Sequence, residues 1–210
     1  MRYILNVDHR VNFTDELMNK FWKLPAFVQF CGPFTEDSAQ KFRENLEMAE
    51  NAAIKCGQDV LPVTIDSYGG SVYALLGMID ALQSCSLKIA TIVESKAMSC
   101  GAVLFSCGAD GYRFIGPNAT VMIHTVSAAE FGKVDELKAS SDEADRLNEK
   151  LFRLMSKNCG HKETYFLDKL QERRMADWYL DPSDCLTHNL ANKIHIPSIK
   201  VDVKCEYKFE

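Results

Sequence analysis

Two residues that can act together in catalysis each stand beside an apolar run that reads as a strand. Ser99 lies among small residues in the stretch 95–102, where a strand is expected to give way to a helix. His124 ends the compact apolar run 121–124. Serine needs a base to become a nucleophile, and histidine is the usual base. Each residue alone also fits a structural role, since a serine at such a junction often caps a helix.

A glycine pair offers the third element of such chemistry. The stretch 66–71 joins an apolar strand to a helix through Gly69 and Gly70. Glycines permit backbone conformations that other residues avoid, and N–H groups at the start of a helix can stabilise an oxyanion. Most such pairs are plain turns. The remaining histidines lie in polar surroundings and are predicted to be surface residues: His9, His161, His188 and His195.

Composition describes an ordinary globular chain. Of 210 residues, 47% are hydrophobic and 25% charged, and the net charge is −5. These values argue against disorder and against binding to nucleic acid or an anionic membrane. No apolar run approaches the ~20 residues of a membrane helix, and the first residues are too polar for a secretory signal. A cytoplasmic location is therefore expected.

The eight cysteines are predicted to be reduced thiols. None forms a CxxC unit, and most lie in apolar stretches, where cysteine acts as a small hydrophobic residue. We therefore expect neither disulfides nor a metal site.

The spacing of apolar residues predicts alternating strands and helices. Thr35 can cap a helix over 36–55, with Ala39, Phe42, Leu46, Ala49 and Ala53 on its apolar face. The other elements, in chain order, are strands 26–31 and 60–65, a helix 71–85, a strand 87–93, a buried helix 99–108 and strands 112–115 and 120–123. This order predicts an α/β fold around a largely buried sheet.

Two later segments differ in pattern. Residues 134–157 predict a long helix with a narrow apolar stripe, formed by Val134, Leu137, Ala144, Leu147, Leu151, Leu154 and Met155. Such a helix packs on another subunit or lies solvated on its own domain. Residues 199–209 alternate apolar and charged side chains, which predicts a half-buried strand.

Four motifs in order resemble the signature of the proteolytic subunit of the Clp proteases, the ClpP family. They are Gly69-Gly70-Ser71, Lys96-Ala-Met-Ser99-Cys-Gly101-Ala102, Pro117-Asn118 with Val121-Met-Ile-His124, and Asp177-Trp-Tyr-Leu180. The resemblance runs from about Gly32 to Ile194, roughly three-quarters of the chain. It implies a ClpP/crotonase-like fold of stacked βαβ units with a protruding handle helix.

The resemblance also implies roles for individual residues. Ser99 would be the nucleophile, His124 the base, and Asp177 a buried carboxylate that orients the histidine. Asp181 and Asp184 lie close by, and a helix-capping role for Asp177 stays open. The backbone N–H groups of Gly69 and Cys100 would form the oxyanion hole.

Substrate, assembly and partners follow by the same resemblance. An unfolded polypeptide would add as a strand between Ser71-Val72-Tyr73 and Phe131-Gly132, and Ser99 would form an acyl-enzyme. Two stacked heptameric rings would form a tetradecamer. An AAA+ unfoldase of the ClpX, ClpA or ClpC kind would feed it, because the chain carries no Walker-type loop. The chemistry requires no metal or other cofactor.

We expect three parts in the chain. These are an axial segment 1–25, a peptidase domain 26–196 with its handle at about 134–157, and a C-terminal strand extension 197–210. The extension, with apolar side chains at Ile199, Val201, Val203, Cys205, Tyr207 and Phe209, is predicted to pack on an apolar surface of the ring. The alternative is that it extends an edge of its own sheet.

The sequence departs from the family pattern close to the predicted site. Tyr68 stands in place of the proline of Ser-Pro-Gly-Gly, Lys96 in place of the glutamine of Gln-Ala-Ala-Ser, and Cys100 where methionine is common. These departures suit a divergent or phage-encoded member. Two other readings are a catalytically silent ring subunit and a crotonase-type acyl-CoA enzyme. Retention of Ser99, His124 and Asp177 argues against both.

Overall fold

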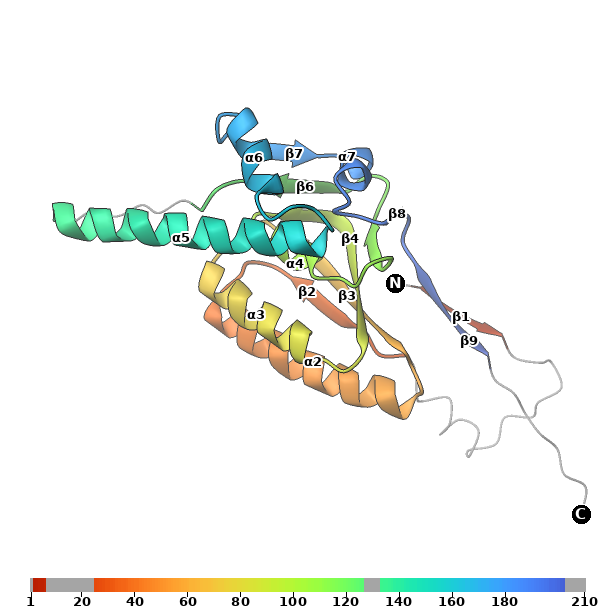
Figure 1. Cartoon of the computed structure of the whole chain (residues 1–210). Helices are drawn as coiled ribbons and strands as arrows, with labels where there is room; N and C mark the ends of the chain where they lie inside the picture. Colours follow the sequence, from red (N-terminus) through yellow and green to blue (C-terminus); the bar gives the residue numbers. More distant parts are fainter. Residues whose placement is uncertain (1, 7–24, 127–132, 203–210) are drawn as a thin grey trace, which may run out of the picture.

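The chain folds around a sheet of mainly parallel strands, as the alternating pattern predicts (Figure 1). The computed structural model describes residues 2–6, 25–126 and 133–202. Within these residues seven strands form the main sheet, in which β2, β3, β4, β5 and β8 lie side by side in that order. Their bounds are Val28–Cys31, Val60–Ser67, Lys88–Met98, Arg113–Ile115 and Lys193–Ile194. Strand β6 (Thr120–Ile123) pairs with β4, and β7 (Trp178–Leu180) adds to β6 antiparallel.

Helices α2 (Glu36–Lys55) and α3 (Val72–Ser84) begin where side chains can cap them. Thr35 Oγ1 accepts the backbone N–H of Ser38 at 3.1 Å, which satisfies one of the free donors at the start of α2. The five residues of the predicted apolar face of α2 are all buried. The predicted cap, bounds and buried face of this helix are thus confirmed.

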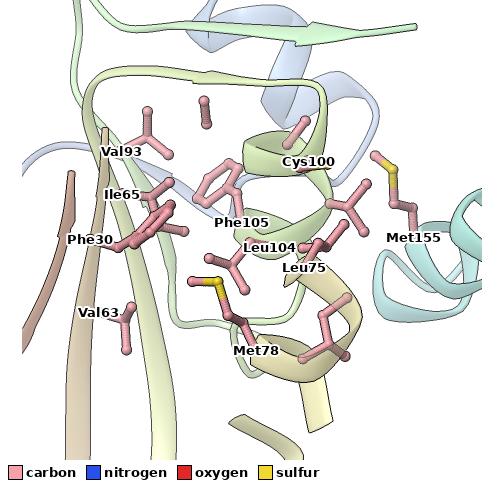
Figure 2. Close-up of a cluster of buried hydrophobic side chains, with 14 of the residues drawn as sticks. Phe30, Val63, Ile65, Leu75, Met78, Val93, Cys100, Leu104, Phe105 and Met155 are labelled. Carbon is pink, nitrogen blue, oxygen red and sulfur yellow. The ribbon is translucent and has the colours of Figure 1, made fainter. Parts of the chain in front are cut away.

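A short buried helix, α4 (Cys100–Ser106), lies at the centre of the core, and all seven of its residues are buried. Figure 2 shows Leu104 and Phe105 of this helix between strand residues such as Val63 and Val93 and side chains of α3. The sequence predicted a buried helix here because the segment is small and apolar throughout. Its packing against β4, α3 and α5 fixes the direction in which its first turn points.

The handle helix α5 (Val134–Asn158) is long and only half buried. Its 25 residues span ~37 Å at 1.5 Å per residue, and Figure 1 shows its first half projecting from the body. Burial starts at Leu147, whereas Val134 and Leu137, at the beginning of the predicted stripe, are exposed in the single chain. The first half of the stripe therefore has no cover within the described chain.

Two short helices and a tight aromatic cluster complete the body. Helices α6 (Tyr165–Glu172) and α7 (Pro182–Thr187) flank β7. The His161 ring stacks on Tyr165, with ring centroids 3.8 Å apart, and the Tyr165 hydroxyl lies 2.7 Å from Nδ1 of His188. His188 also meets the edge of Trp178. His161 and His188, predicted to be surface residues, are thus only partly exposed, because aromatic side chains pack against both of them.

The chain ends pair with each other. Strand β1 (Arg2–Asn6) runs parallel to β9 (Ser198–Asp202) in a separate two-stranded sheet, with Arg2 opposite Ser198. The described residues of the C-terminal strand, 198–202, thus pair with β1 and do not extend the main sheet. Residues 7–24 and 203–210 lie outside the described residues, so packing of the extension on a ring surface stays a prediction.

No helix in the described part of the chain combines the length and the apolar character needed to cross a membrane. The same region holds seven cysteines, and none of them is in a disulfide bond. Cys205 lies outside it.

Replacing the buried Arg113 with methionine is expected to destabilise the fold by about 3–5 kcal/mol. The Arg113 side chain is 1% exposed and donates to the carbonyl oxygens of Gly108, Asn189 and Leu190 at 3.0–3.2 Å. Methionine would leave these carbonyls buried without their donor. Urea unfolding at fixed protein concentration measures the loss. Arg153→Met is the control, because Arg153 is 57% exposed and its ion pairs contribute less than about 0.5 kcal/mol.

Buried thiols are expected to resist alkylation in the folded protein. Burial raises the pKa of Cys107 and of Cys159 to about 12, so at pH 8 only on the order of 10⁻⁴ of each is thiolate. Cys31 is exposed. Iodoacetamide followed by mass spectrometry should label Cys31 first, Cys107 much more slowly, and the buried Cys159 only in urea. Native labelling of Cys159 as fast as that of Cys31 would contradict the packing described.

Candidate active site

Ser99 sits at a sharp strand-to-helix junction in a strained backbone conformation. It follows β4 and precedes α4, with φ 55° and ψ −120°. Only a few per cent of non-glycine residues have positive φ, and such strain persists where surrounding contacts hold it. Here the Ser99 N–H donates to the carbonyl of Met122 at 2.8 Å, and the Ser99 carbonyl accepts the N–H of Ala102 at 2.9 Å. The bend presents the side chain at the edge of the sheet.

Strand pairing brings His124 to this serine. Lys96–Met98 of β4 pair with Thr120–Met122 of β6, so the ends of both strands lie together. His124 Nε2 is 2.8 Å from Ser99 Oγ, a hydrogen-bond distance between residues 25 positions apart. Past the strand, Val126 N–H donates to Oδ1 of Asn148 on the handle helix at 2.7 Å. This bond holds the segment that follows His124 against α5.

Asp177 reaches the other side of the imidazole through the antiparallel pairing of β6 and β7. Ile123 lies opposite Trp178, so His124, which follows Ile123, and Asp177, which precedes Trp178, are neighbours. Asp177 Oδ1 is 3.8 Å from His124 Nδ1, beyond hydrogen-bond distance. The carboxylate is 54% exposed. The prediction of a buried carboxylate is therefore wrong for the single chain.

The neighbouring aspartates point to other tasks. Asp181 caps α7, and its Oδ1 accepts the Asp184 N–H at 2.8 Å and the Ser183 hydroxyl at 2.7 Å. These hydrogen bonds lower the pKa of Asp181. Asp184 lies exposed in the first turn of the same helix. Of these three carboxylates, Asp177 is the one in contact range of His124.

The glycine turn packs directly on the serine. Gly69 has φ +106° and Gly70 φ +145°, both in the region that favours glycine. A Cβ on Gly69 would lie 2.7 Å from the Cβ of Ser99. The Gly69 N–H donates to Ser67 Oγ at 3.0 Å, so it is already engaged rather than free for an oxyanion.

The backbone N–H of Gly70 is better placed than that of Gly69 to donate to an oxyanion. The bridge to Phe34 uses the carbonyl of Gly69 and the N–H of Ser71, at 3.0 and 2.8 Å. In a parallel bridge the intervening residue directs its own N–H and carbonyl to the opposite side. The Cys100 thiol donates to the Gly70 carbonyl at 3.2 Å, so this side of Gly70 faces the residue that follows Ser99. The geometry thus favours Gly70 over the predicted Gly69.

Cys100 begins α4, where the first backbone N–H groups of a helix have no partner inside the helix. Its backbone N–H comes directly after Ser99, and the expected role of this N–H in an oxyanion hole stays a prediction. The side chain is 3% exposed, and burial raises its pKa. The thiol therefore acts as a neutral packing group beside the turn.

A cavity of about 480 Å³ opens beside the Ser99–His124 pair. Its inner wall is apolar and comes from two helices, with Val103 from α4 and Leu151, Phe152 and Met155 from α5. The predicted substrate residues Ser71, Val72 and Tyr73 also line it. Phe131 and Gly132 lie outside the described residues.

Sequence reasoning missed two residues of this site. Gly70 carried the same signal as Gly69, and only the register of the bridge to Phe34 separates them. Asn148 looks like one of several polar residues on the handle, and its bond to Val126 spans 22 residues. No local pattern would have selected it.

One family model, described as Clp protease, matches residues 14–197. The match starts earlier than the motif resemblance and takes in residues 14–31. It includes Ser99, His124 and Asp177, together with the glycine turn.

Proposed function

Because the chain belongs to the Clp protease family, we propose that it is a serine endopeptidase that hydrolyses unfolded polypeptides through Ser99, His124 and Asp177. The observation that carries this proposal is the 2.8 Å contact between Ser99 Oγ and His124 Nε2 at the mouth of an apolar cavity. A nucleophile and a base within hydrogen-bond reach, with a third group facing the base, are the elements of acyl transfer.

In the proposed reaction His124 takes the hydroxyl proton of Ser99 while Oγ attacks the carbonyl carbon of a peptide bond. The N–H groups of Gly70 and Cys100 then donate to the oxyanion. The imidazolium gives its proton to the leaving amine, which departs and leaves an acyl-enzyme. Water, deprotonated by His124, attacks the ester and releases the second product. No step calls for a metal or a nucleotide.

Asp177 is the residue we propose to orient His124. A carboxylate that accepts the Nδ1 proton directs Nε2 toward serine and stabilises the imidazolium. The 3.8 Å separation in the single chain is about 1 Å longer than such a bond. Catalytic hydrogen bonds are often long without substrate and tighten when it binds. We expect this gap to close in the assembled, substrate-bound enzyme.

The proposed substrate is an extended chain lying along residues 71–73, with an apolar side chain in the cavity. Val72, Leu151, Phe152 and Met155 offer this side chain apolar surface and no charge. Phe131 and Gly132 stay the proposed opposite edge of the groove.

We propose that the protein works as two stacked heptameric rings supplied by an AAA+ unfoldase, in the cytoplasm. Membership in a family of ring-forming peptidases that work with ATPases supports this assembly. The exposed Val134 and Leu137 on the projecting half of α5 support it further, because contact with a second ring would bury them.

A fluorophosphonate probe tests the proposal directly. The purified protein should be labelled, mass spectrometry should place the label on Ser99, and Ser99→Ala should not react. The same samples are assayed with fluorogenic di- and tripeptides and sized by light scattering. An assembled ring without label or turnover would replace the proposal with the silent-subunit reading. Binding of an acyl-CoA without labelling would favour the crotonase reading.

A further inference from the structure

Two of the three departures from the family pattern, Tyr68 and Lys96, lie in contact with each other. Tyr68 precedes the glycine turn after β3, and Lys96 lies on β4 three residues before Ser99. The Lys96 ammonium stands 4.5 Å from the centroid of the Tyr68 ring, within the range of a cation–π contact. Residues that the sequence shows as separate substitutions thus form one structural unit.

Asp66 completes this unit and fixes the position of the lysine. Lys96 Nζ donates to Asp66 Oδ1 at 2.5 Å, and the side chains are 21% and 38% exposed. Asp66 lies where the register between β3 and β4 shifts, between Ile65 and Ser67. The hydrogen bond to Asp66 raises the pKa of Lys96, which favours the charged form that the ring contact needs.

The turn next to this unit requires restraint. Gly69 and Gly70 lose more backbone freedom on ordering than any other residue type, and both must hold positive φ angles. Phe34 and Ser67 hold the turn from its inner side. Tyr68, by contrast, is 73% exposed at the rim of the cavity. A tyrosine there does not fix its own φ, as proline would.

We propose that Asp66, Lys96 and Tyr68 form a clamp that positions the Gly69–Gly70 turn for catalysis, with Lys96 as its central member. Lys96 is a positioning residue, since it acts on the turn through Tyr68 and through Asp66 at the base of the turn. This inference rests on the proposed peptidase function and deepens it. The clamp takes over the restraint that a proline at position 68 would supply.

Lys96→Gln removes the charge and keeps most of the side-chain length. We expect kcat for a fluorogenic peptide and the rate of fluorophosphonate labelling both to fall about tenfold, which corresponds to ~1.4 kcal/mol. KM should change less than about twofold, because the contacts that bind substrate equally in the ground state and the transition state are kept. Lys96→Arg keeps the charge over the ring and should stay within about twofold of the wild type.

Lys88→Gln is the matched control. Lys88 lies on the same strand, and its ammonium stands 5.9 Å from the centroid of Tyr112, far from Ser99 in the sheet. Loss of this contact should leave kcat unchanged. An equal fall in kcat for Lys88→Gln and Lys96→Gln would show a general effect on the sheet and overturn the clamp.

A rescue experiment distinguishes loss of the turn's position from general destabilisation of the protein. In the Lys96→Gln background, Tyr68→Pro should restore kcat to within about threefold of the wild type, because proline restrains the turn without a cation. Failure to restore kcat in a protein of unchanged melting temperature would overturn the proposal.

Hydrogen–deuterium exchange keeps the inference separate from the proposed function. Peptides covering residues 66–72 should exchange faster in Lys96→Gln than in the wild type, whether or not the protein turns over substrate. A wild type without turnover or labelling would reject the peptidase function alone. Unchanged exchange and unchanged kcat in Lys96→Gln would reject the clamp alone.

Discussion

His124→Asn is expected to lower kcat for a fluorogenic peptide by about 10⁴–10⁶-fold, the range seen when a serine hydrolase loses its base. Asparagine keeps a neutral polar side chain but cannot take the hydroxyl proton of Ser99, whose Oγ lies 2.8 Å from His124 Nε2 in the wild type. Steady-state assays at saturating peptide concentration measure the fall in kcat. Circular dichroism and light scattering establish that fold and assembly are kept.

A further expectation is that the rate losses of the two single variants do not add in the double variant. Because Ser99 and His124 are proposed to act as one unit, the double variant Ser99→Ala, His124→Asn should be no slower than either single variant. His195→Asn is the control, since His195 is exposed, packs edge-on against Phe114 and should leave kcat within twofold. Full activity of His124→Asn would show that the observed contact is not the catalytic one.

Gly69→Ala is expected to lower kcat/KM by about 10²–10³-fold without unfolding the protein. The new Cβ would stand 2.7 Å from the Cβ of Ser99 and 3.2 Å from its Oγ, so the nucleophile or the turn must move. A displacement of about 1 Å can cost 10²-fold in rate. Alanine at φ +106° adds strain of about 1–3 kcal/mol. Fluorophosphonate labelling should slow in parallel, since it depends on the same oxygen.

Gly57→Ala separates the clash from the backbone strain. Gly57 also has positive φ, at +70°, but a Cβ there would meet nothing within 4 Å. It ends the α2 region far along the chain from Ser99, and its replacement should cost stability alone. If Gly57→Ala and Gly69→Ala reduce kcat/KM equally, contact with the nucleophile is not the cause.

Residue patterns within a segment predicted those helices and strands whose formation depends mainly on residues of the same segment. The bounds of α2 follow from Thr35 and from five apolar residues at helical spacing, and the structure reproduces both. The strand ending in His124 and the buried helix after Ser99 were likewise readable from composition. Because these segments flank the candidate nucleophile and base, much of the site could be inferred before its geometry was known.

Features that depend on distant partners were not readable. Strand β4 was expected to end at residue 93, yet it continues to Met98 through the polar residues Glu94, Ser95 and Lys96, because β6 supplies a second partner there. The choice of Gly70 over Gly69 depends on the bridge to Phe34. The exposure of Asp177 depends on how the chain enters β7 beside open solvent in the single chain.

The double pairing of β4 also bears on when, during folding, the proposed peptidase activity would arise. Residues 91–93 of this strand bind β5 within the core, and residues 96–98 bind β6 and so align Ser99 with His124. A nascent or partly folded copy that lacks the second pairing does not hold His124 beside Ser99, and the proposed nucleophile is then without its proposed base. We therefore expect newly synthesised chains to have no proteolytic activity until the sheet is complete, so that activity depends on completed folding.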